Sequence, residues 1–369
     1  MVLALLCWQQ RAGSAQTAPI PLTQQVSTRA ANDPTHPESQ PRLDVDRDPF
    51  QSPDPIETAP EPNAATSASK SASDIEKDKS GMYTLHANVD EVLLNCSVID
   101  DKGRTVSDLT SKDFRVWEDG VPQAVNSILH QDLPVSMGIL VDNSGSMRDK
   151  RATVNGAALA LLRQSNPQDA AFIVNFSDRA FLDQGFTSDL VALQRGLARD
   201  DSHGTTAMYD AVAASADELV SHAKERKQAL LIITDGADNA SRLTLAQTIR
   251  RVQNLGGPVV YTIGLLFDVD KDEAEQAQDA LESLSRETGG IAYFPRSLQE
   301  LDSIMAQVAY DMRNQYVVDY RSTKPASLGG YRTVRVEVKS PNHGRLTVRT
   351  KKGYYAEPLH TQSAQAMKQ

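Results

Sequence analysis

The chain has 369 residues, a formal net charge of −10 and a pI near 5.2. A chain of this length is too long for a single hydrophobic core of ordinary size, so at least two folded parts are predicted. The excess of acidic over basic residues argues against nucleic acid as a partner. The two cysteines, Cys7 and Cys96, are too few for a disulfide framework and too far apart for a zinc pair.

The first 15 residues resemble the end of a secretory signal peptide. An apolar run from Val2 to Trp8 is followed by the small-residue stretch Ala12 to Ala15, although the basic residues that usually open such a signal are missing. Either the true start lies upstream or the resemblance is accidental. We expect an exported protein, periplasmic or extracellular, and no later stretch is long and apolar enough to span a bilayer.

Residues 16–84 are rich in Pro, Ser and Ala and contain almost no large apolar side chains. Such a segment cannot bury enough surface to offset its chain entropy, so we predict a disordered tether. The last residues, 358–369, are predicted to be a disordered tail.

Short alternating strands occupy two flanks, residues 85–133 and 314–357. Val92, Leu94 and Cys96 alternate with polar neighbours in the first flank, as Val334 and Val336 do in the second. Neither flank has enough strands for a sheet that is stable alone. We therefore predict that the flanks pair with each other in a small β-sandwich, into which the middle of the chain is inserted.

The middle, residues 134–313, alternates apolar runs with segments of helical spacing. Strands are predicted at 135–141, 170–176, 229–233, 259–265 and 291–294, with an antiparallel edge at 180–186. Continuous runs such as ALLII are typical of strands buried on both faces. The pattern predicts an α/β fold with a doubly wound, mostly parallel sheet. If the strand order is 3-2-1-4-5-6, the first and fourth strands are neighbours where the winding reverses.

Polar side chains follow two strands that this order makes neighbours. Asp142, Ser144 and Ser146 follow the first strand, and Asp235 follows the strand at 229–233, while the cluster His203-Gly204-Thr205-Thr206 leads into a helix. Ligands of such sheets bind beyond the carboxyl ends of the strands, where the winding reverses. Two carboxylates and three hydroxyls suit a hard cation, Mg²⁺ or else Mn²⁺ or Ca²⁺. Because hydroxyls are neutral, a carboxylate from a partner would complete the coordination favourably.

The pattern Asp142-x-Ser144-x-Ser146, with Thr206 before Ala-Met-Tyr-Asp and Asp235 in Thr-Asp-Gly, resembles the metal-ion-dependent adhesion site of von Willebrand factor type A domains. The resemblance covers roughly residues 134–312. It implies that the hydroxyl ligands of the metal are Ser144, Ser146 and, because the ligand stands directly before the Ala, Thr206. Both aspartates would act directly or through water. The segments LTSKDFRVWEDGVPQAV and YRTVRVEVKSPNHGRLTVRTKKGYYA are also similar to the flanks of bacterial exported "VWFA-related" proteins.

This resemblance implies a binding module that is not an enzyme, with a protein partner that presents a carboxylate and an oligomeric state that the sequence leaves open. A Mg²⁺-dependent phosphotransferase or hydrolase is the alternative, because Asp142 also resembles the haloacid-dehalogenase arrangement. That chemistry needs a second aspartate where this chain has Ser144. A purely architectural domain with a stabilising ion is the third possibility.

Three further patterns have simpler interpretations. Thr205 is expected to pack or cap beside Thr206. The charge run Arg148 to Arg151 is predicted to be a solvated helix face. The acidic stretch Asp268 to Asp272 departs from an EF-hand loop and is interpreted as a loop with a first helical turn, favoured by the helix dipole.

Overall fold

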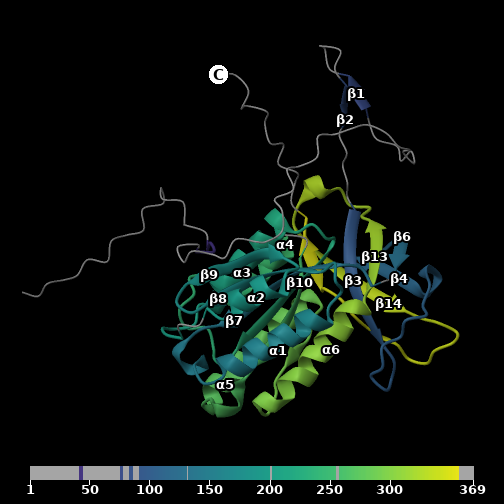
Figure 1. The fold of residues 1–369 in the computed structure, drawn as a ribbon. Helices are drawn as coiled ribbons and strands as arrows, with labels where there is room; N and C mark the ends of the chain where they lie inside the picture. The colour runs from purple at the N-terminus through teal and green to yellow at the C-terminus, as the bar shows by residue number, and fades with distance from the viewer. Residues whose placement is uncertain are drawn as a thin grey trace, which may run out of the picture. The chain divides into compact units, whose positions relative to one another are not determined.

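The computed structural model describes residues 41–44, 75–77, 83–85, 91–130, 132–199, 202–254 and 257–356. Its central feature is a six-stranded sheet in the order β12-β11-β10-β7-β8-β9 (Figure 1). Neighbouring strands run parallel except β9, which is antiparallel to β8 at the sheet edge. The strands are β7 (Val135–Asp142), β8 (Ala170–Phe176), β9 (Ala180–Thr187), β10 (Lys227–Thr234), β11 (Val259–Gly264) and β12 (Ala292–Tyr293).

Counted from β7 along the chain, this order is 3-2-1-4-5-6, which fulfils the condition stated for the sequence, and the α/β fold class is confirmed. The winding reverses between β7 and β10, which are hydrogen-bonded neighbours. Every residue of β7 is buried, as expected for a strand covered on both faces. The carboxyl ends of β7 and β10 therefore meet at one edge of the sheet.

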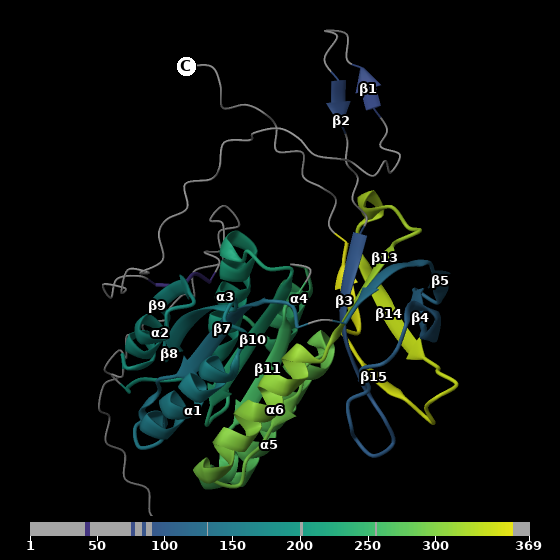
Figure 2. The same cartoon turned by 45° about the vertical axis from the view of Figure 1, so that its right-hand side comes forward.

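Helices cover both faces of this sheet (Figure 2). The apolar side chains of α1, α2 and α6 join one buried cluster, and those of α3, α4 and α5 join the cluster on the opposite face. The helices are α1 (Arg151–Gln164), α2 (Leu190–Leu197), α3 (Met208–His222), α4 (Leu245–Asn254), α5 (Lys271–Thr288) and α6 (Leu301–Arg313). Single 3-10 turns are η1 (Ser111–Asp113), η2 (Gly145–Met147), η3 (Leu266–Asp268), η4 (Leu298–Glu300) and η5 (Ala326–Leu328).

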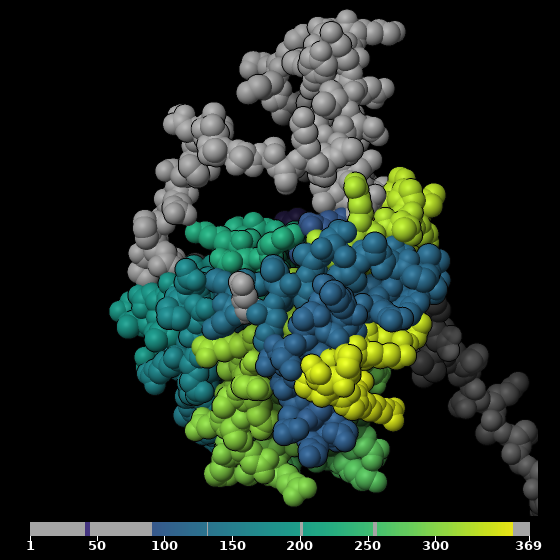
Figure 3. All heavy atoms as spheres, turned by 90° about the vertical axis from the view of Figure 1, so that its right-hand side faces the viewer, coloured from purple at the N-terminus to yellow at the C-terminus, as the bar shows by residue number. Residues whose placement is uncertain are grey.

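The two flanks of the chain pair with each other, as predicted, in two four-stranded sheets. The sheet orders are β15-β3-β13-β6 and β16-β14-β4-β5, so each sheet contains strands from both flanks. Figure 3 shows the two flanks, blue and yellow, side by side on one face. The strands are β3 (Glu91–Ile99), β4 (Phe114–Glu118), β5 (Val121–Gln123), β6 (Val125–Leu129), β13 (Tyr316–Arg321), β14 (Tyr331–Val338), β15 (Thr347–Arg349) and β16 (Gly353–Tyr355).

Apolar side chains of both flanks share one core. This core contains Cys96, which is fully buried as expected, and burial raises the pKa of its thiol to about 12. Aromatic residues of β13 and β16 pack in the same core, including Tyr316 and Tyr354. The flanks therefore pack on each other around a core of their own, separate from the cores of the α/β domain.

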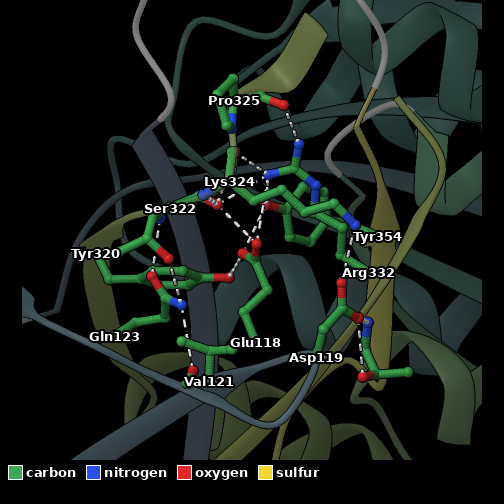
Figure 4. A network of polar contacts seen from close by, with 12 residues as sticks. Glu118, Asp119, Val121, Gln123, Tyr320, Ser322, Lys324, Pro325, Arg332 and Tyr354 are labelled. Atoms are coloured by element: carbon green, nitrogen blue, oxygen red, sulfur yellow. Dashed lines mark hydrogen bonds and ion pairs between the residues drawn. The ribbon is translucent and has the colours of Figure 1, made fainter. Parts of the chain in front are cut away.

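A buried ion pair joins the flanks inside this sandwich (Figure 4). Glu118 of β4 and Arg332 of β14 are 2% and 1% exposed, and they lie 3.3 Å apart. The Glu118 carboxylate also accepts hydrogen bonds from Tyr320 at 2.8 Å, Ser322 at 2.6 Å and Tyr354 at 2.9 Å. Both carboxylate oxygens are thus satisfied by side chains from the other flank.

Part of the predicted tether has described structure. Two short strands, β1 (Ile75–Lys77) and β2 (Tyr83–Leu85), pair antiparallel, and Asp44 forms an isolated parallel bridge with Phe181 of β9. The tether prediction does not hold at these residues. The predicted signal segment and tail lie outside the described residues, and the domain boundaries remain predictions. No helix in the described part of the chain is long and apolar enough to cross a membrane.

Candidate metal centre

The candidate site begins at the last residue of β7. Asp142 is fully buried there, and its Oδ1 accepts the backbone N–H of Ser144 at 2.8 Å. This bond folds the chain back directly after the strand, and η2 starts at the next residue. Ser144 is itself 3% exposed, and its hydroxyl lies 3.1 Å from the hydroxyl of Ser146.

The second side of the site follows β10. Asp235 is 2% exposed, and its Oδ1 accepts a hydrogen bond from the Ser146 hydroxyl at 2.8 Å. Its Oδ2 lies 2.7 Å from Nζ of Lys150, an ion pair whose side chains are 1% and 12% exposed. The hydrogen bonds therefore join the loops after β7 and β10 through Ser146, and they place an ammonium group beside one of the two aspartates.

Thr206 lies on the third loop, and its residue is 5% exposed. Its backbone N–H donates to Oδ1 of Asn239 at 2.8 Å, and the next residue, Ala207, donates to the carbonyl of Ser177 at 2.6 Å. The backbone N–H of His203 donates to the carbonyl of Asn143 at 3.0 Å, which ties this loop to the one after β7. Among the described residues, no hydrogen bond links Thr206 directly to the other four predicted ligands.

Two residues that support Asp142 were not identified from the sequence. Thr234, the last residue of β10, donates to Oδ2 of Asp142 at 2.5 Å. Arg151 lies 3.4 Å from the carbonyl of Asp142 and donates to Asn175 at 2.8 Å and to the carbonyl of Leu197 at 3.0 Å. Thr234 belongs to the Thr-Asp-Gly triplet, but no local sequence pattern indicates which side chain its hydroxyl would contact.

The interpretation of Arg148 to Arg151 as a solvated face is wrong for its last two residues. Arg151 is fully buried and the Lys150 side chain is only 12% exposed. Both lie against the site because η2 turns the chain before α1 begins. Thr205 is exposed while Thr206 is buried, so Thr205 does not pack as expected. Asp270 caps α5 by accepting the N–H of Asp272, and the predicted acidic first turn is confirmed.

The electrostatics of the site favour a bound cation. Burial raises the pKa of Asp142 to about 6, against the opposing hydrogen bonds from Thr234 and Ser144, and the negative charge of Asp235 adds to the rise. Burial and a like charge both disfavour the ionised carboxylate, and a positive charge nearby reverses that preference. Asp235 already has one such partner in Lys150.

The donor set also fits a hard cation. The five predicted ligands, Asp142, Ser144, Ser146, Thr206 and Asp235, offer oxygen and neither nitrogen nor sulfur. The described residues contain no group of three or more His, Cys, Asp or Glu that could hold a metal. A divalent ion at this edge of the sheet would therefore depend on the hydroxyls as well as on the two carboxylates.

A doubly wound α/β domain with oxygen donors gathered at its switch point is the class that this fold and site define. Residues 137–237 match the family model of the von Willebrand factor type A domain. The chain therefore contains a von Willebrand factor type A domain, and the family predicted from the sequence is confirmed. Among the curated proteins, none matches this chain.

Solved structures similar to this chain include a von Willebrand factor type A protein from Catenulispora acidiphila, 14% identical, with a TM-score of 0.42, covering 65% of this chain and 73% of that one. The PilB minor pilin from Streptococcus sanguinis is 12% identical, with a TM-score of 0.40, and the match covers 50% of this chain and 63% of the pilin. Proximal thread matrix protein 1 from the mussel byssus, with a zinc-occupied MIDAS motif, is 15% identical, with a TM-score of 0.43 and coverage of 54% and 50%. This chain thus spans less than two thirds of the second and third of these proteins.

Proposed function

We propose that the type A domain binds one divalent cation, Mg²⁺ or else Mn²⁺ or Ca²⁺, and uses it to hold a carboxylate of a protein partner. The protein would act as an adhesion-type module of an exported protein, and the site would bind without catalysing a reaction. One observation carries the proposal: side-chain oxygens from the loops after β7 and β10 converge within hydrogen-bonding distance of one another. The ligands would be Asp142, Ser144, Ser146, Thr206 and Asp235.

The residues of this chain have separable tasks in the proposal. Asp142 and Asp235 provide negative charge, and Thr234 and Arg151 fix the end of β7 so that Asp142 keeps its orientation. The hydroxyls contribute oxygen without further charge. A bound divalent ion would supply excess positive charge and an open coordination position, which suits an anionic group of a partner.

Catalysis is the weaker alternative on the contacts of Asp142. The side chain two residues after it belongs to Ser144, where a phosphotransferase of this arrangement needs an acid. The carboxylate of Asp142 accepts hydrogen bonds from a threonine hydroxyl and a backbone N–H, and neither group is a general acid. These contacts favour a role in holding a ligand.

Isothermal titration of Mg²⁺ and Mn²⁺ into the chelator-stripped chain tests the metal site. We expect one saturable site whose affinity falls by at least about tenfold in Ser144→Ala, Thr206→Ala and Asp235→Ala, because loss of even an outer-shell partner costs 10- to 100-fold. Thr205→Ala is the matched control, since Thr205 is the exposed neighbour of Thr206. Equal binding in all variants would contradict the assignment.

Capture of a carboxylate-bearing partner is a separate test. Beads that carry a peptide with a single exposed Asp or Glu should retain the protein in Mg²⁺ and release it in excess EDTA. Retention that survives EDTA would contradict the proposed role of the ion. A metal-induced rise in melting temperature, with no retention in Mg²⁺, would favour the purely architectural alternative.

A further inference from the structure

Asp44, which is far from the type A domain in sequence, pairs with the edge of its sheet. The backbone N–H of Asp44 donates to the carbonyl of Ala180 at 2.7 Å, and the carbonyl of Asp44 accepts the N–H of Leu182 at 3.1 Å. Asp44 thereby forms a parallel bridge with Phe181 of β9, the edge strand of the six-stranded sheet. Addition of an extended segment to an exposed edge is a recurrent mode of peptide recognition.

Side chains reinforce this backbone pairing. The Asp44 carboxylate lies 2.7 Å from Nη1 of Arg179, and the aspartate is 21% exposed while the arginine is 61% exposed. Leu43 packs against the buried cluster that contains Phe176 and Ala180. The main-chain hydrogen bonds and the ion pair of Asp44 thus go to the first residues of β9 and the turn before it, and Leu43 adds an apolar contact with the adjoining buried cluster.

We infer that the start of β9, with the turn 177–179, is a binding site for an extended Leu-Asp segment, and that residues 42–44 of the same chain occupy it. Asp44 and Glu91, the first residue of β3, are separated by residues 45–90. A tethered segment has an effective concentration on the order of millimolar when its linker spans the distance. At micromolar protein concentrations, residues 42–44 of the same chain therefore outcompete the same residues of a second copy.

The docking site adjoins the candidate metal centre. The N–H of Ser177 donates to the carbonyl of Arg179 at 2.9 Å and closes the turn, while the carbonyl of Ser177 accepts the N–H of Ala207 at 2.6 Å. Ala207 follows Thr206, a proposed metal ligand. The docked segment, the turn and the Thr206 loop share one chain of hydrogen bonds, so docking biases the position of that loop. This coupling, unlike the docking, rests on the proposed function.

Hydrogen exchange of the Leu182 amide in the full chain tests the docking. Asp44→Pro removes the backbone donor and the carboxylate together, and it leaves the buried parts of the domain untouched. We expect Leu182 to exchange at least tenfold faster in this variant, with the amides of β10 unchanged. An unchanged rate at Leu182 would overturn the docking site, and protection that rises with protein concentration would assign the segment to a second copy.

A charge swap gives a second, milder test. Arg179→Asp and Asp44→Arg should each accelerate exchange at Leu182 by roughly twofold to fivefold, because the arginine is largely exposed and such pairs are weak. The two substitutions together should restore most of the protection. Failure of the pair to restore it, with both single variants accelerated, would show that the ion pair is not part of the docking.

Titration of Mn²⁺ into the wild-type chain and Asp44→Pro tests the coupling. A change in affinity of twofold to tenfold supports it, and equal affinities alongside faster exchange at Leu182 overturn it. Absence of Mn²⁺ binding in both proteins would overturn the proposed metal centre and the coupling, while the exchange rate at Leu182 would still decide the docking.

Discussion

Two regions of this protein bury carboxylates, and they satisfy them differently. In the sandwich, Glu118 accepts hydrogen bonds from Tyr320, Ser322 and Tyr354 and pairs with Arg332, so fixed donors surround both of its oxygens. In the type A domain, Asp142 receives one hydroxyl and one backbone N–H, and the hydroxyl of Ser144 lies against that of Ser146.

This difference in the donors around the two carboxylates distinguishes a structural cluster, around Glu118, from a binding cluster, around Asp142. A buried carboxylate whose neighbours are all hydrogen-bond donors is already compensated without a ligand. Oxygen atoms that lie close to other oxygen atoms favour a bound cation. Lys150 provides a cation at the metal centre, but it reaches Asp235 from a flexible side chain. The two regions should therefore respond to substitution in opposite ways, one through stability and the other through binding.

The largest effect is expected in the sandwich. Glu118→Ala leaves Arg332 buried without its counter-charge, which should lower the free energy of unfolding by about 3–5 kcal/mol. Chemical denaturation measures this loss, and Glu337→Ala is the matched control, because its pair with Arg335 is exposed and worth less than about 1 kcal/mol. A comparable loss in both variants would contradict the structural role of the buried pair.

Lys227 sharpens the comparison, because it is a buried cation with no hydrogen-bond partner for its Nζ among the described residues. Burial lowers its pKa to about 8, although Asp132, Asp169 and Asp311 oppose the fall. Between pH 8 and 10.5 the unfolded state binds the extra proton, so the free energy of unfolding should rise with pH, by up to about 1.4 kcal/mol per pH unit. Below pH 8 both states bind this proton, so the full loss of stability from the buried charge is present.

Lys227→Met should therefore stabilise the protein at pH 7 by roughly 2–3 kcal/mol and weaken the rise above pH 8. Lys351, whose pKa burial also lowers to about 8, keeps part of that rise in the variant. Denaturant melts at pH 7, 8 and 9.5 measure both effects, with the exposed Lys271→Met as control. A destabilised Lys227→Met would show that the three aspartates hold the ammonium more strongly than burial opposes it.

The smallest effect is expected at Lys150. Its ammonium and a divalent ion compete for Asp235, so Lys150→Met should raise the Mn²⁺ affinity by roughly threefold to tenfold. Lys150→Arg keeps the charge and serves as the control in the same titration. Weaker binding in Lys150→Met would mean that the lysine supports the site. The metal centre would then resemble the cluster around Glu118, in which the protein's own donors compensate the buried carboxylate.

Much of the fold follows from local patterns in the sequence. Continuous apolar runs predicted β7 and β10, and alternation predicted β3 and β14. The strand order that the structure has is one of the common orders of doubly wound sheets, and the sequence alone did not select it. The same rule places Asp142 and Asp235 at one edge, and the Ser146 hydroxyl bridges the loops that carry them. Residue type and periodicity suffice here because each depends on near neighbours along the chain.

Tertiary structure alone decided which charges are buried and what they meet. Arg151 looked solvated within a run of four charges, yet it contacts Asn175 and Leu197 from distant elements. Asp44 pairs with Arg179 across 135 positions. The sequence by itself determined the α/β domain, its flanking strands and the residue types at the candidate site. The partners of each buried charge were set by the packing of distant segments, since the cost of burying a charge depends on neighbours that local periodicity does not contain.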